Sequence, residues 1–237
     1  MTDRNPIFCA VDTTDPAAAA ALASGLAGCV GGLKVGLEFF TALGPEGYRA
    51  IAGKGLPIFL DLKFHDIPNT VARAVASISA LGPAITTVHA AGGQAMMRAA
   101  ADAAREAEAR TGTPRPKLVG VTVLTSMDGD DLASVGVSGA VGDQVRRLAA
   151  LARASELDGV VCAPHEIEVV RAECGRDFML VVPGIRPEGA ATGDQKRVMT
   201  PAEAVSLGAD VIVIGRPITQ APDPAAAARA IAQSLWT

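Results

Sequence analysis

The sequence alternates between two kinds of segment, and this alternation recurs about eight times along its 237 residues. Short runs of β-branched or apolar residues are each followed by an Ala-rich amphipathic stretch. The first kind of segment is typical of strands and the second of helices. The expected strands are 7–11, 33–37, 58–63, 85–89, 118–124, 159–163, 179–183 and 211–214. The expected helices include 15–26, 70–81, 94–110, 142–155, 165–173, 201–207 and 224–235.

Strand–helix alternation of this kind implies right-handed crossovers and a parallel sheet. The run Val211-Ile-Val-Ile is apolar on both faces, as expected of a parallel strand covered by helices. Eight such units, in a chain close to the roughly 250 residues of a lone barrel, favour a closed (β/α)8 TIM barrel. We therefore expect an α/β fold with a single catalytic domain over residues 1–237. An open doubly wound sheet is the alternative.

Composition restricts the partners of the chain. The net charge is −4, no basic stripe is present, and aromatic residues make up only 3%. These properties argue against nucleic-acid binding. The uncharged run 16–33 is long enough to span a bilayer, but it is mostly Ala and Gly. We interpret it as a short helix, a Gly-rich turn and the start of a strand, and we expect no membrane partner.

Cysteine usage indicates the compartment. Cys9, Cys29, Cys162 and Cys174 form no C-x-x-C pair and no cluster with zinc-ligand spacing. Reduced thiols in the core of a cytoplasmic protein are therefore expected. The first eight residues are polar and lack a signal-peptide pattern, which agrees with a cytoplasmic location.

The third expected strand carries the most informative charges. Side chains alternate along a strand, so Asp61 and Lys63 share one face and the neighbouring leucines share the other. The two charged residues then point into the barrel near the carboxyl end of the strand, where barrel active sites lie. Asp66 follows just past the strand, and Lys34 on the second strand can lie beside Asp61. Lys34, Asp61, Lys63 and Asp66 would form an alternating charged array, either catalytic or a structural ion-pair network.

The last two strands end in similar elements. Gly215-Arg216 follows the eighth strand, and Pro183-Gly-Ile-Arg186 follows the seventh. A glycine lets the backbone approach a ligand, and an arginine supplies a planar cationic fork. Barrel enzymes often hold phosphate at these two strand ends, so a phosphorylated substrate is expected; surface arginines are the alternative. The stretch 186–198 is either an active-site loop or a plain surface loop.

Further polar residues end other strands. Asp12 ends the first and can accept a hydrogen bond from a sugar hydroxyl or cap a helix. Thr125 ends the fifth and can bond a base or a sugar. His65, His89 and His165 are dispersed and have no metal-ligand spacing, so structural roles are favoured and no metal site is expected. Among them His89, at the end of the fourth strand, is the best candidate for a role in a site.

These residues together resemble a known family. Asp61-Leu-Lys-Phe-His-Asp66 followed by Ile67-Pro-Asn-Thr70 is similar to the signature of the orotidine 5'-monophosphate decarboxylases. The resemblance extends from Asp12 to Arg216. It includes, in order, Leu33-Lys-Val-Gly36, Thr122-Val-Leu-Thr125, Pro183-Gly-Ile-Arg186, Gln195 and Gly215-Arg216. One departure follows Asp12, where the family commonly has an apolar-Pro-Asp turn and this chain has Thr13-Thr-Asp15-Pro.

The resemblance implies a (β/α)8 barrel that acts as a homodimer with shared active sites in pyrimidine (UMP) biosynthesis. The small-molecule substrate would be orotidine 5'-monophosphate and the products uridine 5'-monophosphate and CO2. Its site would combine residues of two subunits. The residues implied are Lys34, Asp61 and Lys63 from one subunit, Asp66, Ile67 and Thr70 from the other, Thr125 at the pyrimidine, Asp12 at the ribose, and Arg186, Gln195, Gly215 and Arg216 at the phosphate.

The implied reaction leaves electron density at C6 in the plane of the ring, where the π system cannot delocalise it. Decarboxylases usually recruit an electron sink such as pyridoxal phosphate or thiamine, but we find no motif for either and expect no cofactor. Lys63, kept protonated by Asp61 and Asp66, would stabilise the carbanion and then protonate C6. Asp61 would repel the substrate carboxylate, and phosphate binding would close the loop 186–198.

Three alternatives remain at this stage. A phosphosugar enzyme with a related Asp-x-Lys-x-x-Asp strand would need a divalent metal and a carboxylate on the second strand, where this chain has Lys34. An aldolase would use Lys63 as a Schiff base. A non-catalytic nucleotide-binding protein would need the phosphate elements but not the charged array.

Overall fold

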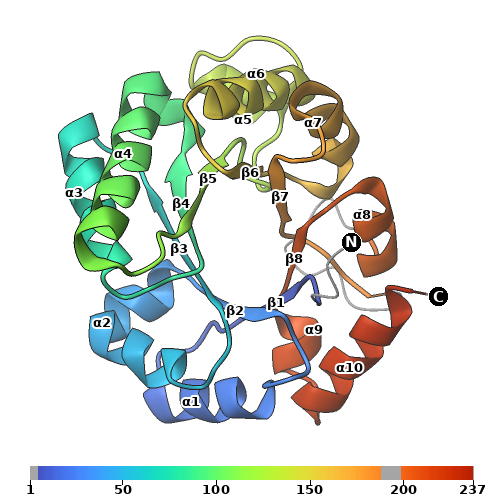
Figure 1. Cartoon of the computed structure of the whole chain (residues 1–237). Helices are drawn as coiled ribbons and strands as arrows, with labels where there is room; N and C mark the ends of the chain where they lie inside the picture. The colour runs from blue at the N-terminus through green and yellow to red at the C-terminus, as the bar shows by residue number, and fades with distance from the viewer. Residues whose placement is uncertain (1–4, 188–198, 237) are drawn as a thin grey trace.

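The strands close into a barrel. The computed structural model describes residues 5–187 and 199–236. Every neighbouring pair of strands is parallel, and the first strand also pairs with the last, so the order β1-β2-β3-β4-β5-β6-β7-β8 has no edge (Figure 1). The strands are β1 (Ile7–Ala10), β2 (Gly32–Val35), β3 (Ile58–Phe64), β4 (Ile85–His89), β5 (Lys117–Val121), β6 (Gly159–Val161), β7 (Met179–Val182) and β8 (Val211–Ile214). The predicted (β/α)8 barrel is confirmed, and the open sheet is excluded.

Helices surround the strands as an outer ring (Figure 1). The α-helices are α1 (Pro16–Gly25), α2 (Leu37–Ala52), α3 (Pro68–Ser79), α4 (Gly93–Thr111), α5 (Gly129–Ser134), α6 (Val141–Ala154), α7 (Ile167–Cys174), α8 (Pro201–Leu207), α9 (Arg216–Thr219) and α10 (Pro224–Ser234). Two 3-10 turns, η1 (Ala90–Gly92) and η2 (Pro164–Glu166), precede α4 and α7.

Five expected strands, 7–11, 33–37, 118–124, 159–163 and 179–183, end one to three residues earlier than the sequence pattern indicates, and β2 and β5 show why. Leu37 is not the end of β2 but the first residue of α2, because the backbone leaves the strand at Gly36. β5 ends at Val121, because the chain beyond it bends into a turn in which the Met127 N–H donates to the Leu124 carbonyl. Thr125 therefore lies beyond the strand rather than at its end.

The uncharged run 16–33 has the predicted form. It comprises α1, a turn through Gly28 at φ 76°, and the start of β2. Asp15 caps α1, since its carboxylate accepts the backbone N–H groups of Ala17 and Ala18. In the described part of the chain, no helix is both long enough and apolar enough to cross a membrane.

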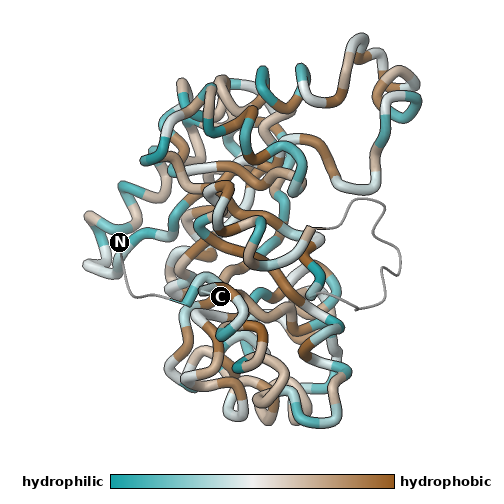
Figure 2. Tube along the Cα trace, turned by 90° about the vertical axis from the view of Figure 1, so that its right-hand side faces the viewer, coloured by the Kyte–Doolittle hydropathy of each residue, from teal (hydrophilic) through white to brown (hydrophobic). Residues whose placement is uncertain are grey.

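The apolar residues form two separate cores. The inner core fills the barrel at the end where the strands begin, and it consists of Phe8, Phe59, Ile85, Val119, Val181 and Val211. The larger outer core lies between the opposite faces of the strands and the helices. In the side view the hydrophobic colours accordingly concentrate along the middle of the molecule (Figure 2). The inner core thus separates a hollow at the strand starts, lined in part by Phe8, Ile85 and Val211, from the space at the strand ends, where the active sites of barrel enzymes lie.

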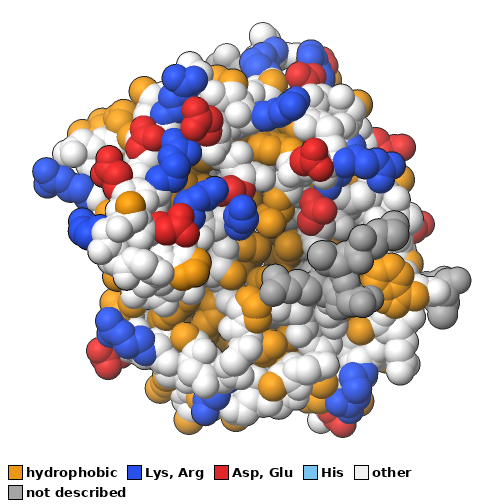
Figure 3. Space-filling view, in the orientation of Figure 1, with side chains coloured by type: hydrophobic (Ala, Val, Ile, Leu, Met, Phe, Trp, Pro, Cys, Tyr) orange, Lys and Arg blue, Asp and Glu red, His pale blue; other side chains and the backbone are white. Residues whose placement is uncertain are grey.

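A polar network ties the strands together where they begin. Asp158, just before β6, accepts hydrogen bonds from Arg115 and Lys117 and from the backbone N–H of Leu118 in β5. Asp210, just before β8, accepts from Arg171 and from the backbone N–H of Leu180 in β7. On the face shown in Figure 3, acidic and basic side chains gather beside a hollow with apolar side chains. In barrels this end serves stability rather than catalysis.

Candidate active site

A cavity of about 170 Å³ lies where the strands end. Its charged lining residues are Lys34, Asp61 and Lys63, from β2 and β3. The floor is apolar and formed by Phe59, Val161, Val181 and Val213, which belong to or pack against the inner core. The rest of the lining is Val121, Val123, Leu124, Thr125, Cys162 and Pro183. Three charged groups therefore share a small space with apolar walls, where electrostatic interactions are stronger than in water.

The third strand presents its charges as predicted. Leu60 and Leu62 are buried on the helix side, whereas Asp61 and Lys63 line the cavity. Lys63 Nζ lies 2.6 Å from Asp61 Oδ2, and the two side chains are 30% and 14% exposed. The lysine ammonium is thus held against a carboxylate at the edge of the cavity.

Lys63 has an unusual backbone conformation that the sequence does not reveal. Its φ is 50°, in the left-handed region that side chains other than glycine rarely adopt. The pairing of β3 with β4 shifts register between Leu60 and Phe64, so the strand is irregular at this lysine. The Lys63 N–H donates to the hydroxyl of Thr87 on β4 at 2.8 Å. Thr87 was not singled out by sequence, and its only signal was its inward position on β4 beside β3.

Lys34 differs from the expected arrangement. Its Nζ forms an ion pair with Asp12 Oδ1 at 3.0 Å, rather than the predicted contact with Asp61. The register explains this pairing, because Lys34 lies opposite Ala10 on β1 and opposite Phe59 on β3, two residues before Asp61. Asp12 just past β1 is therefore within reach of the lysine. The helix-capping alternative for Asp12 is wrong, because Asp15 performs that role.

The fourth member of the expected array lies apart. Asp66 and Thr70 are exposed and do not line the cavity, and Ile67 between them is 66% exposed. Asp66 Oδ1 accepts the Ile67 N–H at 2.6 Å. Within one chain, the structure does not bring Asp66 together with Lys63. These three residues instead present a polar and apolar surface to the outside.

The expected phosphate residues follow β7 and β8. Arg186 is buried and donates to the Ile185 carbonyl at 2.9 Å. Arg216 is exposed and is the first residue of α9, directly after Gly215. A Cβ added at position 215 would lie 3.4 Å from the Ala10 Cβ and 3.8 Å from Asp12 Oδ2, so Gly215 lies close to Asp12, but these are ordinary contacts that do not require a glycine. Gln195 and most of the stretch 186–198 lie outside the described residues.

Two of the histidines meet beside the cavity. The ring centroids of His65 and His89 are 5.3 Å apart. Burial lowers the pKa of His89, and the nearby charges of His65 and Lys63 lower it further, against the opposing effect of Asp61. The neutral form of His89 is therefore favoured.

His165 lies apart in η2 and is exposed. In residues 5–187 and 199–236, no group of three or more His, Cys, Asp and Glu could hold a metal ion.

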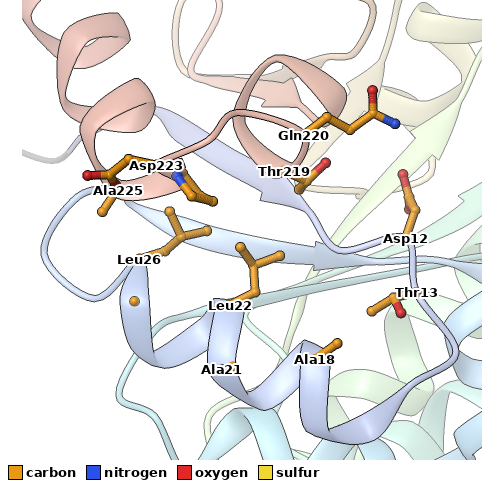
Figure 4. Close-up of a pocket in the computed structure, with 12 residues that line it drawn as sticks. Asp12, Thr13, Ala18, Ala21, Leu22, Leu26, Thr219, Gln220, Asp223 and Ala225 are labelled. Carbon is orange, nitrogen blue, oxygen red and sulfur yellow. The ribbon is translucent and has the colours of Figure 1, made fainter.

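A larger hollow of about 590 Å³ lies between α1 and the α9–α10 segment, and Asp12, the partner of Lys34, lines it (Figure 4). Leu22 of α1 and Leu26 just after it line one side, and Thr219 and Gln220 line the opposite side. None of the three charged residues of the small cavity lines this hollow. It offers volume without a cluster of reactive groups, so the smaller cavity is the candidate active site.

The chain forms a closed parallel (β/α)8 barrel, and charged side chains line a cavity at the carboxyl ends of its strands. This combination is typical of the enzymes that have this fold. The sequence profile of the Orotidine 5'-phosphate decarboxylase / HUMPS family matches residues 5–231. The chain belongs to this family.

Individual relatives are similar to this chain in sequence over nearly its full length. The chain is 58% identical, over 231 residues, to the orotidine 5'-phosphate decarboxylase of Paramagnetospirillum magneticum, with 98% of each sequence covered. It is 52% identical over 236 residues to that of Moorella thermoacetica, covering 99% of this chain and 94% of the relative. The crystal structure of orotidine 5'-phosphate decarboxylase from Lactobacillus acidophilus superposes with a TM-score of 0.84 at 38% identity. That alignment covers 99% of this chain and 100% of the other.

Proposed function

We propose that this chain is an orotidine 5'-monophosphate decarboxylase of pyrimidine biosynthesis, which forms uridine 5'-monophosphate and CO2. The observation that carries the proposal is the ion pair of Lys63 and Asp61 at the edge of the small cavity, at 2.6 Å. The two relatives described above have the same activity in their names.

The chemistry requires a charge close to C6. When the bond between C6 and the carboxylate breaks, the electron pair stays on C6 and CO2 departs. The Lys63 ammonium stabilises this carbanion and then transfers a proton to C6, after which solvent restores the lysine proton. Asp61 holds the Lys63 ammonium in an ion pair and, in this proposal, repels the substrate carboxylate. The reaction as proposed needs no cofactor.

The remaining residues bind the rest of the nucleotide in this proposal. Thr125 on the cavity wall contacts the pyrimidine, and Asp12 with its partner Lys34 contacts the ribose. The phosphate is held after β7 and β8 by Arg186, Gln195, Gly215 and Arg216. Support comes from the location of these strand ends, which is where barrel enzymes often bind phosphate.

Lys34 also argues against the metal-dependent alternative. In the metal-dependent alternative, a carboxylate on the second strand would be a ligand of the divalent metal. Here a lysine from β2 lines the cavity instead, and an ammonium group repels a divalent cation. The donor set therefore favours an anionic substrate over a metal ion.

We further propose a homodimer with shared sites, in which Asp66, Ile67 and Thr70 complete the site of the partner subunit. Their exposure at the start of α3 supports this arrangement, because Ile67 is apolar and 66% exposed.

We propose that the enzyme works in the cytoplasm. The four cysteines are free and buried, which fits a reducing compartment, and burial raises the pKa of Cys9 to about 12.

The test follows the absorbance of orotidylate in metal-free buffer with EDTA. We expect substrate loss and stoichiometric formation of uridine 5'-monophosphate, unaffected by the chelator. Loss of activity with EDTA that a divalent metal restores would favour the metal-dependent phosphosugar chemistry. Trapping of Lys63 by borohydride in the presence of substrate would favour a Schiff-base enzyme.

A further inference from the structure

Thr87 links the two charged residues of β3. Its side chain is fully buried on the inner face of β4. The hydroxyl accepts the backbone N–H of Lys63 at 2.8 Å and donates to Asp61 Oδ1 at 2.9 Å. A hydroxyl has one proton to donate, and the carboxylate receives it here. One side chain thereby touches both members of the Lys63–Asp61 ion pair.

The bond to Lys63 supports a conformation that is otherwise unfavourable. At φ 50° the lysine lies outside the strand conformation, where the β3–β4 register shifts. Its N–H is directed to the Thr87 hydroxyl rather than to a backbone carbonyl of β4. Strained residues of this kind persist only where their surroundings hold them, and they cluster at functional sites.

The bond to Asp61 fixes the orientation of the carboxylate. Its Oδ2 accepts from Lys63 Nζ, and its Oδ1 accepts from Thr87. With both oxygens engaged, the carboxylate cannot rotate without breaking one of these bonds. The position of the lysine ammonium is therefore set both through its own backbone and through its counter-ion.

We propose that Thr87 is a positioning residue, which holds the ammonium of Lys63 and the carboxylate of Asp61 in their reactive arrangement. This inference rests on the proposed function, since it assigns those two residues to the chemistry. Loss of the hydroxyl releases the lysine backbone and one carboxylate oxygen. The phosphate elements after β7 and β8 do not contact Thr87 in the hydrogen bonds described, so substrate binding is affected less than turnover.

The preceding residue provides a matched control. Thr86 is the same residue type on the same strand, and it is also fully buried. Because strand side chains alternate, it faces the helices rather than the barrel interior. Its hydroxyl donates to the Leu60 carbonyl at 2.8 Å. Thr86→Val therefore removes a buried hydroxyl of equal burial without touching the ion pair.

The experiment compares Thr87→Val, Thr87→Ala, Thr87→Ser and Thr86→Val with the wild type in kcat, KM and melting temperature. We expect Thr87→Val and Thr87→Ala to lower kcat by about tenfold or more, with KM changed by less than about threefold. Thr87→Ser retains the hydroxyl and should recover most of kcat. Thr86→Val should lower the melting temperature but leave kcat within about twofold, because misplacement of reacting groups rather than lost stability reduces turnover.

Several outcomes would overturn the role of Thr87. They are an unimpaired kcat in the folded Thr87 variants, an equal loss of kcat in Thr86→Val, or a folded Thr87→Ser that is as slow as Thr87→Val. If Thr87→Val does not fold, Thr87→Ala and Thr87→Ser still decide the question. A wild type without activity on orotidylate would overturn the proposed function and this inference with it. An active wild type with unimpaired Thr87 variants overturns the role of Thr87 alone.

Discussion

The ammonium of Lys63 is the only group of the Lys63–Asp61 pair that can give a proton to C6. We predict that Lys63→Ala reduces decarboxylation below detection, because both carbanion stabilisation and proton transfer are lost. Binding of uridine 5'-monophosphate, measured by calorimetry, should largely survive. Lys54→Ala, at an exposed position after α2, is the control for the same substitution and should retain full activity. A near-normal kcat in Lys63→Ala would remove the lysine from the chemistry.

Arg216 is an exposed residue that follows Gly215 at the end of β8. We predict that Arg216→Ala raises KM and lowers kcat/KM. The corresponding loss of transition-state binding free energy should be about 1.5–3 kcal/mol, the range of a hydrogen bond to a charged group. The dephosphorylated substrate orotidine should be affected much less. The measurement is kcat/KM for both substrates, with Arg49→Ala on the surface of α2 as control. Equal losses for the two substrates would contradict a phosphate contact.

His89 gives the folded protein a pH dependence near neutrality. Its pKa in the folded protein lies below the ordinary 6.5. As pH falls below 6.5, His89 is therefore protonated in the unfolded chain before it is protonated in the folded protein. Stability therefore falls as pH decreases from 6.5 towards the pKa of the folded state, and it is recovered above 6.5. We predict that His89→Gln flattens this part of the profile.

The measurement is the melting temperature between about pH 5 and pH 7.5, the range in which a histidine ordinarily titrates. His165→Gln replaces an exposed histidine and should leave the slope of the wild type unchanged. The same slope in His89→Gln as in the wild type would show that His89 does not titrate differently in the two states.

At the scale of elements, Asp158 joins β5 to β6. Burial alone would raise the pKa of this carboxyl, but hydrogen bonds from Arg115, the Leu118 N–H and Lys117 outweigh it and hold the pKa below 3.8. Its stabilising contribution is present at neutral pH and disappears as pH falls through the pKa of the folded state. We predict that Asp158→Asn costs about 2 kcal/mol at pH 7, and less at an acidic pH below the pKa of the folded state.

Denaturant unfolding at the two pH values measures this difference. Asp102→Asn removes an exposed partner of Arg105 on α4 and should change stability by less than about 0.5 kcal/mol. An equal cost of Asp158→Asn at both pH values would contradict a contribution that depends on the ionised carboxylate.

Elements with a clear period were predictable from the sequence, and interrupted ones were not. The strand 211–214 has the predicted bounds because an apolar run ends directly at Gly215. α2 was absent from the predicted helices, since Gly44 at φ 57° and Pro45 break its pattern with a kink. The short helices α5 and α9 are too brief to show a helical period.

The candidate site was predictable where it depends on strand alternation. Alternation alone gave Asp61 and Lys63 their common face. The ion pair of Lys34 with Asp12 depends on the register between strands, which the sequence does not encode locally. Thr87 was missed for a related reason, because threonine is an ordinary strand residue and its hydroxyl becomes significant only beside Lys63.

At the scale of the whole molecule, the shared-site proposal makes a quantitative prediction. Lys63→Ala and Asp66→Asn are each expected to be nearly inactive. In a mixed dimer, one site would carry both lesions and the other neither. Random reassortment makes about half of the dimers mixed, so activity should recover to about a quarter of the wild type per total site.

The two variants are denatured, mixed, refolded and assayed, with each variant treated alone as control. Mass spectrometry counts the mixed dimers. If mixed dimers form and activity does not return, Asp66 acts within its own subunit and the shared-site arrangement is wrong.

The inner core has a consequence for the order in which products leave. Phe8, Phe59 and their apolar neighbours pack below the cavity, so the direction in which products can leave is towards the ends of the strands. In the proposed reaction, CO2 formed beside Lys63 leaves in the same direction as the bulkier nucleotide. CO2 either diffuses past the bound nucleotide or remains in the cavity until the nucleotide dissociates. A CO2 molecule that remains lies next to the C6 carbanion, which can react with it to re-form the substrate. Rapid protonation of C6 removes the carbanion, so decarboxylation becomes irreversible while CO2 is still in the cavity.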